Sequence, residues 1–128
     1  MDRLALRLRL HRLDGLPLEA VNLLHDITPG STMKSGYLLI NDKDCCWHSW
    51  VETKDGEVLD INYHLATLKD PEFGSCKVER LTEKPTDLEV HEDPDTVERF
   101  NMNKKDFWKS APKKFRDLRT KVQTLSRS

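Results

Sequence analysis

Residues 45–62 read Cys-Cys-Trp-His-Ser-Trp-Val-Glu-Thr-Lys-Asp-Gly-Glu-Val-Leu-Asp-Ile-Asn, and they decide how the fold of this chain is interpreted. The Asp-Gly pair at positions 55 and 56 predicts a tight turn between two neighbouring strands. This hairpin carries His48 on one strand and Asp60 on the other, with cysteines beside the histidine. A thiol, an imidazole and a carboxylate are the groups of a cysteine-dependent active site, so the same stretch decides whether the chain is interpreted as an enzyme.

The length of the turn determines whether His48 and Asp60 can meet. Side chains alternate between the two faces of a strand, and a two-residue turn sets His48 on the face opposite to Asp60. A three-residue loop with Gly56 in the left-handed conformation instead pairs Trp50 with Asp60 and His48 with Asn62. Asp60 then lies diagonal to His48, about 7–8 Å away at the backbone, where a carboxylate can orient an imidazole. The alternative is an amphipathic hairpin whose His48 and Asp60 only face solvent.

The strings His-Ser-Trp-Val-Glu at 48–52 and Asp-Gly-Glu-Val-Leu-Asp at 55–60 resemble a hairpin of the papain-like, transglutaminase-like cysteine hydrolase superfamily, which includes small phage and bacterial members. The resemblance covers about residues 33–64. It implies an α+β fold, in which a small antiparallel sheet of three or four strands carries the upstream helix on the face of His48. It also implies that His48 is the general base and Asp60 its orienter. Trp50 and Asn62, beside them, are candidate binding residues.

The nucleophile of this family is a cysteine at the N-terminus of the upstream helix, where the helix dipole lowers the thiol pKa. The best upstream helix here runs from Pro17 to about Ile27 and ends before a Thr-Pro-Gly sequence. Residues 15–21 align with a family pattern Gly-Asn-Cys-Tyr-Glu-Ala-Ala, which places Pro17 at the cysteine position. Proline suits the first helical position but cannot attack a carbonyl. This is the largest departure from the family.

Two cysteines are candidates to replace the missing nucleophile. Cys46 shares a strand face with His48, although a thiol on a strand lacks the helix dipole. Cys76 could begin a helix with its thiol near the positive end, and some papain-like enzymes are circularly permuted so that the histidine precedes the cysteine. The alternative for that segment is a strand with Cys76 and Val78 facing inward. Buried structural thiols are the default interpretation for all three cysteines, Cys45 included.

Metal binding is disfavoured, and no cofactor is expected. No Cys-x-x-Cys or His-x-x-x-His spacing occurs, and adjacent cysteines on a strand face opposite ways. The side chains that could otherwise supply zinc ligands are Cys45, Cys46, His48, His64 and Cys76. With 128 residues the chain fits one domain, and it shows neither a signal-peptide pattern nor an apolar stretch of 18 residues. An odd number of cysteines, three, predicts free thiols in a reducing, cytoplasmic compartment.

The net charge of −1 conceals two oppositely charged segments. Residues 86–98 contain six acidic residues and no lysine or arginine, whereas residues 104–128 contain nine basic residues against two acidic ones. This tail can contact nucleic acid, an acidic protein or an anionic surface, or fold back on the acidic segment. Its candidate binding residues are Lys113, Lys114, Arg116 and Arg119. An apolar stripe at helical spacing accompanies them, formed by Phe115, Leu118, Val122 and Leu125, with Phe107 and Trp108 just before it.

The stripe packs either on its own domain or on a partner. We therefore divide the chain into a papain-like domain, residues 1–103, and a basic helical extension, residues 104–128. Elsewhere, the alternation of leucines at positions 4, 6, 8 and 10 predicts a strand, and residues 36–40 predict another. A long connection over about residues 65–103 has a short element at 76–81.

Two functions remain open from the sequence. The first is a catalytically degenerate domain that binds a protein partner or a larger assembly, such as a viral one, through its basic helix. The second is an active thiol hydrolase or acyltransferase acting on an amide or ester bond, with His48 as base, Asp60 as orienter and Cys76 or Cys46 as nucleophile. The first is favoured because Pro17 occupies the nucleophile position.

Overall fold

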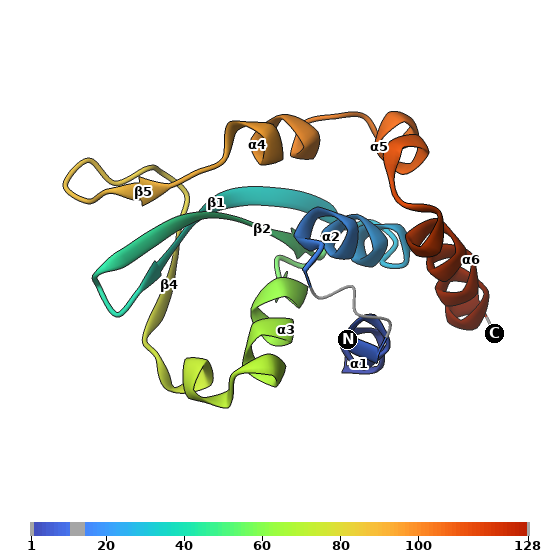
Figure 1. Cartoon of the computed structure of the whole chain (residues 1–128), viewed down its shortest axis with the longest axis horizontal. Helices are drawn as coiled ribbons and strands as arrows, with labels where there is room; N and C mark the ends of the chain where they lie inside the picture. The colour runs from blue at the N-terminus through green and yellow to red at the C-terminus, as the bar shows by residue number, and fades with distance from the viewer. Residues whose placement is uncertain (1, 11–14, 128) are drawn as a thin grey trace.

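A computed structural model of the chain describes residues 2–10 and 15–127 (Figure 1). The described part has an α+β fold with six α-helices, one short 3-10 helix and five strands. In chain order these are α1 (Asp2–Leu10), α2 (Pro17–Asp26), β1 (Thr32–Ile40), β2 (Asp44–Glu52), β3 (Val58–Leu59), α3 (Ile61–Lys69), η1 (Pro71–Ser75), β4 (Val78–Leu81), β5 (Val90–His91), α4 (Pro94–Phe100), α5 (Lys104–Ser110) and α6 (Lys113–Arg127).

The sheet is built around the long antiparallel hairpin of β1 and β2. Its strand order is β3-β2-β1-β4, and β5 joins the start of β2 in parallel. Every other pairing is antiparallel within the described residues. Asn41 and Asp42 turn the chain between β1 and β2 with φ of 54° and 56°, a left-handed conformation that these two residue types tolerate. The predicted strand at 36–40 therefore exists but begins four residues earlier, at Thr32.

The turn after β2 has three residues, which is the register that lets His48 meet Asp60. The Thr53 amide donates to the Glu57 carbonyl at 2.8 Å, and Gly56 has φ +85°. Val51 pairs with Leu59 in the same register. The returning strand is shorter than predicted, because Asp60 ends it by capping α3. The expected pairing of His48 with Asn62 is therefore wrong, since Asn62 lies in the first turn of a helix.

The N-terminal segment is a helix, so the predicted strand over its four leucines is wrong. Leu4, Ala5 and Leu8 are buried, while Leu6 and Leu10 are 55% and 74% exposed. Positions 4, 5 and 8 share a face of a helix but not of a strand. Leucine, alanine and arginine are all strong helix formers, and this segment has no β-branched residue. Helix propensity and burial of this face outweigh the period-2 alternation.

Helix α2 matches the predicted helix and packs against the sheet, but not on the face expected for it. Its buried side chains share one core cluster with Val51 of β2, and Met33, Trp47 and Leu59 pack against that cluster. Because side chains alternate along β2, His48 projects from the opposite face. The expectation that His48 faces the upstream helix is therefore wrong.

The C-terminal helices are part of the same core. Phe107, Trp108, Phe115, Leu118 and Val122 are all buried in the cluster that contains α1 and α2. The stripe thus packs on its own chain, which is one of the two arrangements left open above. The side chain of Leu125, its fourth predicted member, lies outside the residues described.

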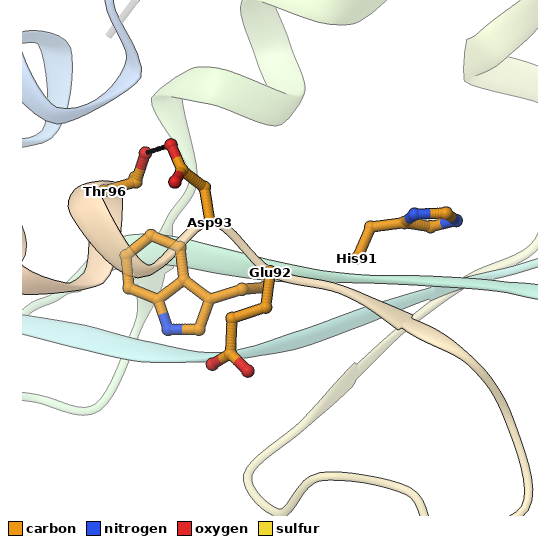
Figure 2. Close-up of a pocket in the computed structure, with 5 residues that line it drawn as sticks. His91, Glu92, Asp93 and Thr96 are labelled. Atoms are coloured by element: carbon orange, nitrogen blue, oxygen red, sulfur yellow. Dashed lines mark hydrogen bonds between the residues drawn. The ribbon is translucent and has the colours of Figure 1, made fainter.

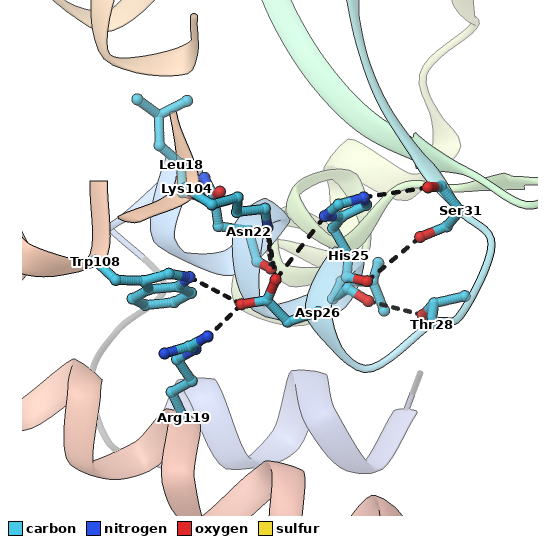
Figure 3. Close-up of polar contacts among 10 residues, drawn as sticks. Leu18, Asn22, His25, Asp26, Thr28, Ser31, Lys104, Trp108 and Arg119 are labelled. Atoms are coloured by element: carbon cyan, nitrogen blue, oxygen red, sulfur yellow. Dashed lines mark hydrogen bonds and ion pairs between the residues drawn. The ribbon is translucent and has the colours of Figure 1, made fainter. Parts of the chain in front are cut away.

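Polar contacts from one residue of α2 reinforce this packing (Figure 3). Asp26 accepts from Lys104 Nζ at 2.8 Å, from the Trp108 indole at 2.8 Å and from Arg119 Nε at 3.1 Å. Two basic side chains of the tail, Lys104 and Arg119, are thus paired with Asp26 rather than with the acidic segment 86–98.

The segment between α3 and α5 carries more structure than the sequence predicted. It contains η1, β4, β5 and α4. The strand alternative for residues 76–81 is the one observed, since β4 spans Val78–Leu81. No helix in the described ranges 2–10 and 15–127 is long and apolar enough to cross a membrane.

Candidate functional site

His48 and Asp60 form a close hydrogen-bonded contact on the sheet face opposite α2. His48 Nε2 lies 2.7 Å from Asp60 Oδ2, and the two side chains are 13% and 3% exposed. Strand β2 positions the imidazole, and the three-residue turn returns the chain so that Asp60 lies diagonal to it. Of the two alternatives left open by the sequence, the structure therefore shows the one in which these residues meet.

Asp60 is held by four donors. Its Oδ1 accepts from the Tyr63 amide at 3.0 Å as the N-cap of α3, and its Oδ2 accepts from His48 and from Arg80 Nε and Nη2 at 3.1 and 2.8 Å. Burial acts to raise the pKa of this carboxyl, but the His48 bond and charge, the Tyr63 amide and Arg80 together hold the pKa below its ordinary value. Asp60 is therefore a fixed carboxylate.

The carboxylate determines which nitrogen of His48 is basic. An ionised carboxylate only accepts hydrogen bonds, so Nε2 carries the proton in the contact with Asp60. The lone pair of neutral His48 is consequently on Nδ1, the ring nitrogen that would take a proton from a reacting group. This arrangement has the base and the orienter of a proton-transfer site.

Trp50 packs beside His48, and its ring lies against Gly36 of the neighbouring strand β1. The two rings are stacked with centroids 6.2 Å apart and planes at 28°. A Cβ at Gly36 would lie 2.8 Å from Trp50 Cη2 and 2.4 Å from the Leu81 carbonyl oxygen, so only glycine leaves room for both. Trp50 is 5% exposed, which makes it a supporting wall of the site rather than an open binding residue.

The cysteines do not complete the site. Cys45 is on the opposite face of β2 from His48, and burial raises the pKa of its thiol. Burial also raises the pKa of Cys46, which disfavours the nucleophilic thiolate. No hydrogen bond joins a sulfur to His48 within the described part of the chain.

Cys76 is not at the start of a helix. It follows η1 in an extended conformation, φ −72° and ψ 147°, and its Sγ lies 3.9 Å from the Glu72 carbonyl oxygen. The prediction that Cys76 begins a helix is therefore wrong.

The N-terminus of α2 is joined to the first turn of α3, the helix that Asp60 caps. Asn62 Nδ2 donates to the Pro17 carbonyl at 3.0 Å, and Asn62 is in that first turn. Pro17 is the first residue of α2, as predicted. The residue that aligns with the nucleophile in the resemblance is therefore hydrogen-bonded to the turn after Asp60, and it is a proline.

The candidate binding residues of the tail divide into two groups. Arg119 is bonded to Asp26 and stacks over Trp108 with its guanidinium carbon 4.6 Å from the ring centroid, so it holds the fold together. Lys113, Lys114 and Arg116 are exposed on the outer side of α6. Lys113 pairs with Asp117 at 2.9 Å, and a surface pair of this kind is weak.

Arg80 is the member of the site that the sequence analysis missed. A signal was present, because a strand with Cys76 and Val78 on one face also places position 80 on that face. Arg80 pairs with Leu38 across β1 and β4, and it covers Asp60 and the Tyr63 ring. The strand interpretation of 76–81 would have identified it.

Comparison of the chain with protein-family models, curated proteins and solved structures found no match. Among the described residues, no group of three or more His, Cys, Asp or Glu side chains is placed to hold a metal ion. The site is therefore interpreted from its own geometry.

Proposed function

We propose that this chain is a catalytically silent relative of the papain-like, transglutaminase-like hydrolases, which serves as a protein-binding or assembly module. The observation that carries the proposal is the combination of an ordered His48–Asp60 pair with Pro17 at the N-terminus of α2. A base and its orienter are present, but the position from which a thiol would attack carries a side chain without a nucleophilic atom.

The remaining thiols support the proposal. A catalytic cysteine needs a depressed pKa, whereas burial raises the pKa of both Cys45 and Cys46. Cys76 follows a short 3-10 helix and has the Glu72 carbonyl as its neighbour. Three free cysteines suit a reducing compartment such as the cytoplasm.

We assign binding to the outer face of α5 and α6, which we call the basic face. It consists of exposed side chains that point away from the core, namely Lys105, Lys109, Lys113, Lys114, Arg116 and Lys121. The apolar side of these helices packs in the chain's own core, so a partner would contact the charged side. An acidic protein surface complements such a face.

Alkylation by iodoacetamide at about pH 6 tests the silent site, because only an activated thiolate reacts quickly there. The wild-type chain is expected to label slowly at all three cysteines, and slowest at the buried Cys45. P17C is expected to add one rapidly labelled thiol, and P17C/H48Q is expected to lose that rapid reaction. Rapid, His48-dependent alkylation of Cys46 or Cys76 in the wild type would overturn the proposal, and so would a P17C thiol that labels no faster than the others.

Retention on immobilised polyglutamate tests the basic face. We expect K113E/K114E to elute at a lower salt concentration than the wild type. K54E/K69E is the matched control, because it makes the same change in charge at two exposed lysines outside α5 and α6. Equal elution of the two double variants would contradict the assignment of the basic face. Tighter retention of the wild type on duplex DNA at the same salt concentration would show that the partner is a nucleic acid instead.

A further inference from the structure

A hollow of about 450 Å³ opens where β5 and α4 meet β2 (Figure 2). It lies on the sheet face opposite His48, since Trp47 of β2 lines it. The other lining residues are His91, Glu92, Asp93 and Thr96. Asp93 is fixed in place, because it accepts from Thr96 Oγ1 at 2.9 Å and caps α4 by accepting from the Asp95 amide at 3.2 Å. The hollow is thus a formed feature with an aromatic wall and two carboxylates.

Trp47 is the one tryptophan of the three that is not buried, and all three lie in the described part of the chain. Its indole contacts the Phe100 ring edge-on, with centroids 5.4 Å apart and planes at 78°. A partly open indole beside carboxylates is suited to a lysine or arginine cation. Tryptophan is also among the residues that most often anchor interfaces.

The hollow lies in the most acidic part of the surface, which we call the acidic end. It comprises residues 86–98, whose exposed carboxylates are Asp87, Glu89, Glu92, Asp93, Asp95 and Glu98. Lys84 pairs with Glu92 at 3.0 Å, and no other ion pair among the described residues reaches this segment. The acidic end therefore carries a large uncompensated negative charge.

The acidic end begins at β5, whereas most of the basic face lies on α6. Figure 1 shows β5 and α6 at opposite ends of the longest axis, with α4 and α5 between them. The ion pairs of the tail run to Asp26 and Asp117, and within the described residues none runs to 86–98. In the described part of one molecule, no ion pair therefore joins the two surfaces.

We propose that the acidic end binds the basic face of a second copy of this chain, with a lysine of α6 entering the Trp47 hollow. Both surfaces carry six charged side chains of opposite sign, so the partner with the required charge is present on the chain itself. The contact joins different surfaces of the two copies and leaves one of each free, so it propagates head to tail. The inference rests on the proposed function, for which it identifies the partner of the basic face.

Sedimentation velocity of the full chain tests the contact across a range of protein concentrations. The wild type is expected to associate in about 20 mM NaCl and to dissociate in about 500 mM NaCl, where the Debye length is only a few ångströms. K113E/K114E lowers the charge of the six residues of the basic face from +6 to +2, and E89K/D95K lowers that of the acidic end from −6 to −2. Each is expected to lower the association constant about tenfold or more, because the attraction across the contact weakens and two like charges are introduced into it. The control K54E/K69E is expected to associate like the wild type.

An equimolar mixture of the two double variants gives the sharpest result. Each variant alone has one unchanged and one weakened surface, whereas the mixture can join the unchanged acidic end of one variant to the unchanged basic face of the other, so association is expected to return. W47F, which keeps an aromatic wall, and D93N, which keeps a side-chain cap for α4, are expected to weaken association without unfolding the chain.

A wild type that stays monomeric in low salt overturns the inference, and so does a mixture that fails to restore association. Either failure is distinguishable from failure of the proposed function. If the wild type is monomeric but K113E/K114E still loses retention on polyglutamate, the basic face binds an acidic partner that is not a second copy.

Discussion

Truncation of Phe115 to alanine is the most direct test of the architecture, because it asks whether the C-terminal helices are core or extension. The Phe115 side chain is 0% exposed and stacks on Trp108 with ring centroids 5.4 Å apart. It belongs to the cluster shared with α1 and α2. Deleting a fully buried aromatic ring typically costs about 3–5 kcal/mol, through lost burial and the cavity left behind. Since a domain of this size has only about 5–15 kcal/mol of stability, F115A is expected to remove a large part of it.

Urea unfolding followed by far-UV circular dichroism measures this loss. We expect one transition with an unchanged slope and a lower midpoint, because the helices unfold together with the sheet. K114A is the matched control, since the neighbouring Lys114 is exposed on the same helix and its truncation should change stability by less than about 0.5 kcal/mol. A loss below about 1 kcal/mol in F115A, or a separate early transition for the tail, would refute the assignment of α6 to the core. Deletion of residues 104–128 should unfold the chain for the same reason.

Three further predictions concern the sheet and two titrating groups. G36A is expected to lose about 1–3 kcal/mol of stability in urea unfolding, because its Cβ meets the Leu81 carbonyl at 2.4 Å, while G15A meets nothing within 4 Å and should be neutral. D60N is expected to lose about 1–3 kcal/mol at neutral pH by unpairing a partly exposed arginine and a histidine. Because the folded pKa of Asp60 lies below 3.8, this difference should be full above that pH and shrink as the pH falls through the folded value. A difference that grows on acidification below pH 3.8 would contradict it. Burial and Lys104 lower the pKa of His25 from 6.5, so stability should decline as the pH falls below 6.5, and H25Q should show a flatter profile between about pH 5 and 7.

The hairpin was the part of the fold most accessible to sequence reasoning. An Asp-Gly turn and alternating side chains predicted β2 and reduced the contact between His48 and Asp60 to a choice between two turn lengths, of which the three-residue one is observed. Pro17 marked the start of α2 correctly, because a proline at the first helical position is a local signal. These features depend on neighbours within a few residues, and local sequence therefore predicts them well.

The errors arose where one local pattern suited two structures. Leucine alternation fitted a strand, but the N-terminal segment buries a helical face formed by Leu4, Ala5 and Leu8. The segment at Cys76 permitted a helix or a strand, and pairing with β1 made it the strand that brings Arg80 to Asp60. Hydrogen bonds between β4 and the distant strand β1 determine this conformation, and the local sequence does not indicate which strand will pair with it.

The amino-acid sequence alone gives the reactive groups of the site, the two possible registers of its hairpin and the absence of a thiol at position 17, because these depend on residue type and on a short turn. The tertiary structure decided the rest. Which sheet face receives α2, which arginine neutralises Asp60 and whether the apolar stripe of α6 is buried all depend on contacts between residues far apart in the chain. Burial of apolar area is non-directional, so the whole arrangement of helices and sheet is needed to determine which surfaces it covers.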